Sequence, residues 1–250
     1  MYFELQEIKH RPYPMPNAPW MMTQVWRDLL FMHYPVAPHL LREIVPQELE
    51  LDTYKNEAWL SIIPLKITDM RVRGVPPIPL LSSYIELNVR TYVIYQGVPG
   101  IYFFSLDASD LISVIGAKAG TGLPYKLAKM EFSEHDDIFR FKSHRITGTQ
   151  EKLDVSFKRG NVLYEPLPGS LDFWLLERYC MYSFWGNHIL RGDIHHDQWK
   201  VAHAVAEIHQ NTMASFLPKG TLTNNSPILH YARRRRFLFF PLKKVGKRVG

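Results

Sequence analysis

The chain has 250 residues, of which 46% are hydrophobic and 22% charged. This composition excludes disorder, collagen and a coiled coil as the main architecture, and the length predicts one domain over residues 1–250. No apolar run is long enough for a membrane helix, and the N-terminus lacks the apolar segment of a secretory signal. The one cysteine, Cys180, has no partner for an internal disulfide. These features predict a cytoplasmic protein with no membrane partner.

The net charge of +6 comes entirely from the C-terminal end of the chain. Residues 233–250 hold eight Lys and Arg and no acid, which leaves 22 basic and 24 acidic residues elsewhere. Nucleic-acid binders usually spread basic groups along a folded surface, with stacking or base-reading groups between them. We therefore expect no nucleic-acid partner. Residues 228–240 are expected to form a strand with solvated arginines, and residues 242–250 a frayed basic tail.

In the first half of the chain most predicted elements are strands. Four prolines make residues 1–20 an extended arm. Pro38 begins a short helix that runs to Val45 and ends at Pro46. Asp107 or Ser109 is expected to cap a helix through about residue 119. The other predicted elements are a strand at 29–33, a hairpin of 49–54 with 58–63, a proline-rich loop at 71–81, a strand at 83–95, a turn at 96–100 and a returning strand at 101–106.

The second half continues the β pattern around one apolar segment at 170–184, which is helical or irregular. No internal repeat or low-complexity linker interrupts it. The whole pattern predicts an α+β, β-rich domain: an antiparallel closed or cone-like β-barrel, or a double-layer sheet, with two or three short helices. The strands predicted here are 139–147, 152–158, 199–206 and 228–240.

The strand at 83–95 carries an unusual polar face. Glu86, Asn88, Arg90 and Tyr92 alternate with apolar residues and so point to one side. A polar face of this kind is most often the solvent face. The returning strand, however, reads YFFSL and leaves little polar surface on either side. If the sheet curls, Glu86 and Arg90 would line a pocket.

Other motifs point more weakly to chemistry. No phosphate-binding loop, dinucleotide fingerprint, zinc signature or serine-hydrolase elbow is present. His195 and His196 would point to opposite faces of a strand, so only His195 lies with Asp193 and Asp197 on one face. A metal site needs three or four converging ligands, and we expect a hydrogen-bonded turn, with no metal and no cofactor.

Three isolated groups have ordinary structural interpretations. Cys180 has no histidine partner by spacing and is expected to be a buried, inert thiol. His203 and His209 are expected to be structural. Lys126 and Lys129, in the segment GLPYKLAKM, read as solvated lysines, because a Schiff-base lysine needs desolvation or a neighbouring cation to lower its pKa.

Several segments resemble the YqjF-like family of uncharacterised proteins. They include HRPYPMPNAPWMMTQVWRDLLFMHYPV, AWLSIIPLKITDMRVRGVPPIP, TGLPYKLAKM, ERYCMYS and RGDIHH. The resemblance runs from about His10 to Pro241. It implies a fold more than a function, because the family has no established activity.

That family more distantly resembles the acetoacetate decarboxylase superfamily, over roughly Trp26 to Leu127. The resemblance implies a cone-like β-barrel with its site inside, and it places the active-site arginine on Arg27 and the active-site glutamate on Glu86. In those enzymes two adjacent lysines follow a proline, and the first forms an imine with the substrate. Here Tyr125 stands at the first position and Lys126 at the second. The second lysine lowers the pKa of the first, a mechanism well known for this decarboxylase.

The resemblance therefore implies a pocket without the imine-forming lysine. We expect Arg27 and Arg90 to bind a small carboxylate or keto compound. Glu86, Tyr125 and Lys126 are the candidate catalytic residues. Three functions remain open: a ligand-binding protein, an enzyme with lyase, hydratase or enolisation chemistry on a small organic acid, and a structural or partner-binding protein. Relatives with this barrel often form oligomers, and no residue here fixes a number of subunits.

Overall fold

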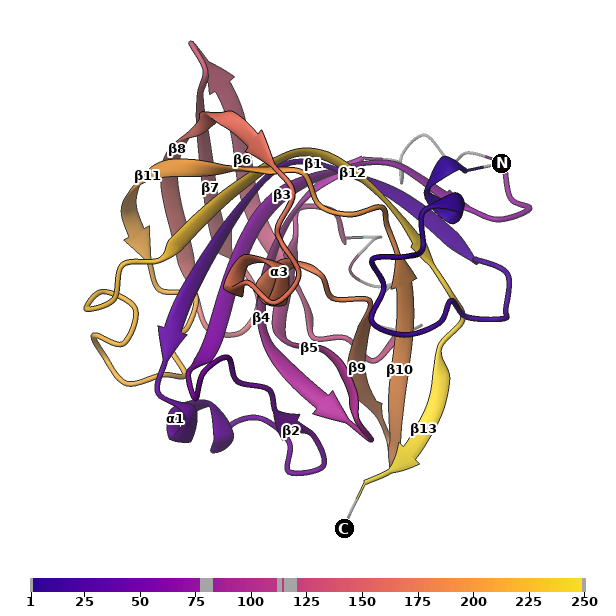
Figure 1. Ribbon diagram of the computed structural model, residues 1–250. Coiled ribbons are helices and arrows are strands. Elements are labelled where there is room, and N and C mark those ends of the chain that lie inside the picture. The colour runs from indigo at the N-terminus through magenta and orange to yellow at the C-terminus, as the bar shows by residue number, and fades with distance from the viewer. Residues whose placement is uncertain (1, 77–82, 112–113, 115–120, 249–250) are drawn as a thin grey trace.

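The computed structural model describes residues 2–76, 83–111, 114 and 121–248, and a single 13-stranded sheet forms its framework (Figure 1). Two short α-helices and one 3-10 helix lie within the described residues. The elements are η1 (Phe3–Gln6), β1 (Met22–Val36), α1 (Pro38–Arg42), β2 (Glu50–Leu51), β3 (Ala58–Val72), β4 (Tyr84–Tyr95), β5 (Val98–Ala108), β6 (Tyr125–His135), β7 (Ile138–Arg145), β8 (Lys152–Tyr164), α3 (Leu171–Leu176), β9 (Cys180–Trp185), β10 (His188–His195), β11 (Val201–Asn211), β12 (Ile228–Phe239) and β13 (Lys243–Lys247).

The strand order confirms the β-rich fold class and corrects the simple antiparallel barrel. The order is β13-β10-β9-β5-β6-β7-β8-β11-β12-β1-β3-β4-β2, with further pairings between β5 and β4 and between β10 and β12. Strand β5 pairs in parallel with both β6 and β9, so the sheet is mixed. Because β5 and β12 each have three neighbours, the sheet is branched and curves around an interior that α3 partly covers (Figure 1).

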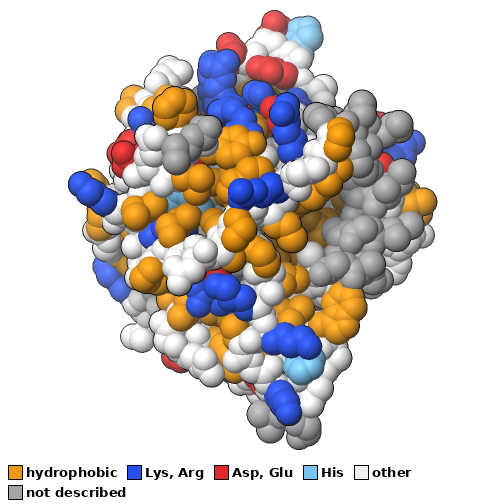
Figure 2. Space-filling model, turned by 90° about the vertical axis from the view of Figure 1, so that its right-hand side faces the viewer, with side chains coloured by type: hydrophobic (Ala, Val, Ile, Leu, Met, Phe, Trp, Pro, Cys, Tyr) orange, Lys and Arg blue, Asp and Glu red, His pale blue; other side chains and the backbone are white. Residues whose placement is uncertain are grey.

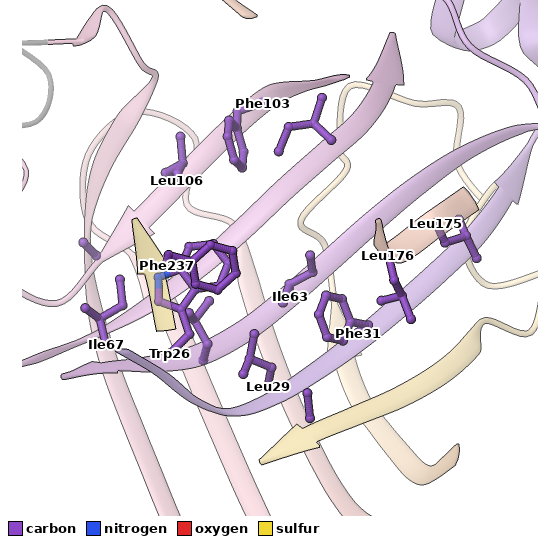
Figure 3. Packing of buried hydrophobic residues seen from close by; sticks show 14 of the residues in the cluster. Trp26, Leu29, Phe31, Ile63, Ile67, Phe103, Leu106, Leu175, Leu176 and Phe237 are labelled. Carbon is purple, nitrogen blue, oxygen red and sulfur yellow. The ribbon is translucent and has the colours of Figure 1, made fainter. Parts of the chain in front are cut away.

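The long strands form because their sequences are apolar on both faces. β1 and β3 lie between two apolar clusters, so neighbouring residues such as Leu30 and Phe31 pack into different cores. The first core lines the interior of the curved sheet. Figure 3 shows Trp26, Leu29, Ile63 and other members of this interior core packed between the strands and α3.

Three predicted elements need correction. Residues 49–54 do not form a hairpin with 58–63, because β2 pairs with β4, and only a tight bridge joins Tyr54 to Glu57. Asp107 is a buried residue of β5 and caps no helix, while the Ser109 hydroxyl accepts from the Ile85 N–H; most of the predicted helix lies outside the described residues. No element was predicted for GLPYKLAKM, whose residues from Tyr125 onward begin strand β6.

The basic end is also more ordered than its charge suggested. Lys243–Lys247 form β13, which pairs with β10. Arg235 is buried and pairs with Asp197, although its neighbours Arg233 and Arg234 are exposed as expected. On the face seen in Figure 2, Lys and Arg side chains lie separately among apolar ones. No helix among the described residues is long and apolar enough to cross a membrane.

Candidate functional site

The polar face of β4 points into the interior of the sheet. Glu86 is 2% exposed, Asn88 is fully buried and Arg90 is 6% exposed, so this is not a solvent face. The residues paired with them on β3 are, in the same order, Leu65, Ile63 and Ser61. One residue lies between each polar group and the next, so each step of two residues along the face is roughly 7 Å.

Glu86 lies at one end of this face, in a group of hydroxyl donors. The Tyr125 hydroxyl donates to Glu86 Oε2 over 3.2 Å. Tyr84, two residues before Glu86 on β4, lies beside it and accepts from Gln24 Nε2 over 3.4 Å. Gln24 in turn accepts from the indole N–H of Trp26 over 2.9 Å. The fold therefore brings Glu86 and Tyr125, two of the candidate catalytic residues, into contact.

Burial changes the protonation of this group. It raises the pKa of Glu86 to about 7, although the hydroxyls of Tyr125 and Tyr84 favour the charged form. Burial also raises the pKa of both tyrosines, so their hydroxyls keep their protons. Glu86 is consequently a carboxyl group that exchanges a proton near neutral pH, next to a hydroxyl that donates hydrogen bonds.

Arg90 lies at the other end of the face, and it has no ion pair within the described residues. Its Nε has no hydrogen-bond partner, and its guanidinium lies 6.0 Å from the centre of the Tyr92 ring. Arg178 also lies over Tyr92, at 4.9 Å, but Asp52 neutralises it across 2.6 Å. The interior therefore holds one buried cation without a counter-ion among the residues described.

Asn88 lies between the two ends, with both side-chain polar atoms unused. Neither its Oδ1 nor its Nδ2 hydrogen-bonds to any part of the chain that the structure describes. Buried amides nearly always have partners, and an unpaired one is costly. The Asn88 amide lies beside Glu86 and favours the charged form of that carboxyl group.

A hydroxyl–imidazole cluster lies beside Arg90. Ser61, directly opposite Arg90 on β3, has its Oγ 2.7 Å from His33 Nδ1 and 2.7 Å from the Tyr92 hydroxyl. Tyr92 and His33 Nδ1 are 3.3 Å apart. Burial, with the charge of Arg90 nearby, keeps the pKa of His33 well below its ordinary value, so the ring is neutral.

Two candidate residues do not join this group. Arg27 follows Trp26 on β1 and lies on the opposite face, where its Nε donates to Thr68 Oγ1 over 3.1 Å. Lys126 follows Tyr125 on β6, so its side chain leaves the interior and shares a face with Asp107. Of the two candidate arginines, Arg90 therefore lies in the interior and Arg27 does not.

The histidine pair lies beneath the N-terminal arm. His195 is in β10, where Arg11 Nη1 donates to its Nδ1 over 3.0 Å and its Nε2 donates to the Glu4 carbonyl over 2.5 Å. His196 bonds to the Asp197 carbonyl over 2.8 Å. The segment is a strand rather than the expected turn, and the described residues contain no group of three or more metal ligands. Cys180 is buried, as expected.

Reasoning from sequence missed several groups that complete the interior. Tyr84 stands two residues before Glu86 on the same face, a signal that strand alternation offered. His33 and Ser61 are lone polar residues in the apolar stretches LLFMHYPV of β1 and AWLSIIPL of β3, which is a sign of a buried polar cluster. Arg178 lies in the irregular chain after α3, and no local pattern places it against Tyr92.

Comparison with known proteins places the chain in a family. The model of the DUF2071 family, described as an uncharacterized conserved protein, matches residues 23–236. The uncharacterized protein YqjF of Bacillus subtilis (strain 168) is 40% identical over 240 residues, which cover 96% of this chain and 98% of YqjF.

Solved structures share the fold at low identity. The enduracididine biosynthesis enzyme MppR, complexed with pyruvate, has a TM-score of 0.66 at 9% identity and covers 94% of this chain and 93% of its own. An acetoacetate decarboxylase-like enzyme from Sphingomonas wittichii RW1 has a TM-score of 0.64 at 10% identity, covering 94% and 99%. Acetoacetate decarboxylase from Legionella pneumophila has a TM-score of 0.62 at 16% identity, covering 97% and 94%. The chain belongs to the DUF2071 family, with YqjF as a close relative, and has an acetoacetate decarboxylase-like fold.

Proposed function

We propose that the interior of the sheet binds a small monocarboxylate that carries a keto group. The observation that carries the proposal is Arg90, a buried guanidinium without an ion pair among the described residues. An isolated buried charge is costly, and a carboxylate would neutralise it through paired, charge-assisted hydrogen bonds. Because Asp52 already neutralises Arg178, one negative charge suffices.

The order of groups along β4 suits the rest of such a ligand. With the carboxylate on Arg90, the Asn88 amide is the next polar group along the face. Glu86 follows on the same face, where it would act on carbon-bound protons further along the ligand. Pyruvate has this chemistry, and the fold neighbour MppR binds it.

We further propose that any chemistry at this site is proton transfer without an imine. A phenol has no amine, so Tyr125 forms no Schiff base at the position where the decarboxylases carry their lysine. Lys126 lies on the opposite face of β6. Enolisation needs only a base near neutral pH and a donor for the oxygen; Glu86 offers the base, and the Ser61 and Tyr92 hydroxyls beside Arg90 offer the donor.

The test compares two matched substitutions, Arg90→Met and Arg27→Met, by titration calorimetry with pyruvate. A charged hydrogen bond contributes about 1.5–3 kcal/mol, so Arg90→Met should weaken binding by about ten- to hundredfold. Arg27→Met should leave the affinity within about twofold.

The stability of the unliganded variants is a second measurement, in which Arg90→Met should gain while its affinity for pyruvate falls. Methionine removes the unpaired charge and keeps most of the side-chain volume, so Arg90→Met should raise the free energy of unfolding. A misfolded variant would lose binding and stability together. Unchanged pyruvate affinity in Arg90→Met, with wild-type binding measurable, would exclude Arg90 as the carboxylate site. No pyruvate binding by the wild type would reject this ligand class.

A further inference from the structure

Three imidazoles lie side by side on adjacent strands, and the proposed ligand site does not use them directly. His203 on β11 is exposed, whereas His230 on β12 and His33 on β1 are fully buried. The ring centres of His203 and His230 are 5.7 Å apart and nearly parallel, and those of His230 and His33 are 5.4 Å apart at 62°. The line runs from the surface to the interior core.

The two buried rings of this line each meet a polar side chain. Beside the middle ring, Asp172 at the start of α3 lies 3.3 Å from His230 Nε2 and accepts from the Tyr164 hydroxyl over 2.8 Å. Asp172 is 26% exposed, so it contacts solvent. At the inner end, His33 Nδ1 meets Ser61, which lies opposite Arg90.

The buried ring atoms between these side chains are unpaired. Neither His33 Nε2 nor either ring nitrogen of His230 makes a hydrogen bond within the described residues, although His230 Nε2 lies 3.3 Å from Asp172. A neutral imidazole carries one donor and one acceptor. When His33 Nδ1 accepts from Ser61, its Nε2 carries the proton; when His230 Nε2 faces the Asp172 carboxylate, its Nδ1 is free to accept. The two unpaired atoms are then complementary, and a small ring rotation or one bridging water joins them.

We propose that Ser61, His33, His230 and Asp172 form a proton relay between the ligand's oxygen and solvent. The relay rests on the proposed function, in which Glu86 exchanges the proton on the neighbouring carbon. In the enol-to-keto direction the enol O–H bond breaks, and its proton passes to the Ser61–Tyr92 pair. Protonated Glu86 gives its proton to the carbon, which forms the new C–H bond and leaves Glu86 as a carboxylate. One proton leaves to solvent at Asp172, and Glu86 takes one up from solvent before the next turnover, so the number of protons is conserved. Protons alone move, and no oxidant or reductant takes part.

The first test needs no ligand. Nitrogen-15 NMR of histidine-labelled protein reports which ring nitrogen carries the proton. The relay requires both His33 and His230 to be neutral and protonated on Nε2. Substitution Asp172→Ala should remove this preference in His230, because the carboxylate that selects the tautomer is gone. Opposite tautomers in His33 and His230 would break the chain of donors and overturn the relay.

The second test measures incorporation of solvent deuterium into the methyl group of pyruvate. His230→Phe should slow incorporation by roughly a hundredfold, the range of positioned proton transfer. Asp172→Asn keeps an oxygen that accepts from His230 but takes up a proton poorly, so it should slow incorporation too. Because Asp172 is partly exposed, Asp172→Asn should fold even if His230→Phe does not.

The matched control is His203→Phe, which replaces the exposed ring stacked on His230 by another aromatic ring and leaves all four relay residues in place. It should leave the rate within about twofold. If His230→Phe and His203→Phe slow incorporation equally, or if neither slows it, the relay is overturned. If the wild type binds no pyruvate while the tautomers are as stated, the proposed ligand fails and the relay stands on the NMR result.

Discussion

Glu86 links the site to the stability of the fold, because its pKa is about 7 in the folded protein against an ordinary value of 4.5. The folded state holds this proton more tightly, so stability falls as pH rises from about 4.5 to 7 and is constant above. A shift of this size corresponds to about 3 kcal/mol. We expect Glu86→Gln, which is neutral and still accepts from Tyr125, to unfold at higher denaturant than the wild type at pH 8.

Denaturant titrations at two pH values check this expectation. At pH 4 the carboxyl group is protonated in both states, so wild type and Glu86→Gln should then have the same midpoint within error. A variant that is less stable than the wild type at pH 8 would show that the carboxylate form is the stabilising one. The same variant should also lose deuterium incorporation into pyruvate, because an amide is not a base.

Tyr125 supports a second prediction at the residue scale. Borohydride reduces imines to stable amines, so a protein that forms a Schiff base with a keto acid gains the mass of the adduct. We expect no adduct in intact-mass measurements after treatment with pyruvate and borohydride, since position 125 has no amine and Lys126 lies outside the interior group. Tyr125→Lys is the informative companion, because it restores an amine beside Lys126. An adduct in the wild type, mapped to any lysine, would contradict the imine-free mechanism.

At the scale of single elements, alternation in β4 was readable from sequence and placed Glu86, Asn88 and Arg90 on one face. The burial of that face was not readable, because it depends on strands far away in the chain. A local departure from strand alternation also turns Arg27, the arginine predicted for the site, away from the interior. Asp28 has a φ of 52°, so Trp26 and Leu29 both face the interior core while Arg27 faces away. No residue type in the segment required that bulge, and the resemblance alone pointed to Arg27.

Pairing between elements was harder to predict than the elements. The parallel neighbours of β5 are β6 and β9, which follow it by about 20 and 75 residues, and hairpin logic pairs only neighbours in sequence. Strand β6 itself was hidden by Pro124 and the two lysines, which are typical of a loop. The prediction of a frayed basic tail rested on its charge alone. In the structure β13 pairs with β10, and Lys243 forms an ion pair with Asp193.

At the scale of the whole molecule, one buried ion network holds the branched sheet together beside the site. Arg145 of β7 reaches past β6 to Asp107 of β5, with which it makes two hydrogen bonds of 2.8 and 2.9 Å. It also pairs with Glu151, which in turn accepts from Ser215. Asp107 is directly beside Lys126 on the opposite side of β5 and β6 from the Glu86 group.

Removing Arg145 would leave two buried carboxylates without their cation. We expect Arg145→Met to lower the free energy of unfolding by about 3–5 kcal/mol, the usual cost of breaking a buried ion pair from one side. Arg140→Met is the control on the same strand, because Arg140 pairs with Asp154 at the surface, where such pairs contribute less than about 1 kcal/mol. Urea titrations of both variants would measure the difference. Similar losses in the two would mean that the network stabilises the fold no more than a surface pair, and that packing alone holds β5, β6 and β7 in register beside Tyr125.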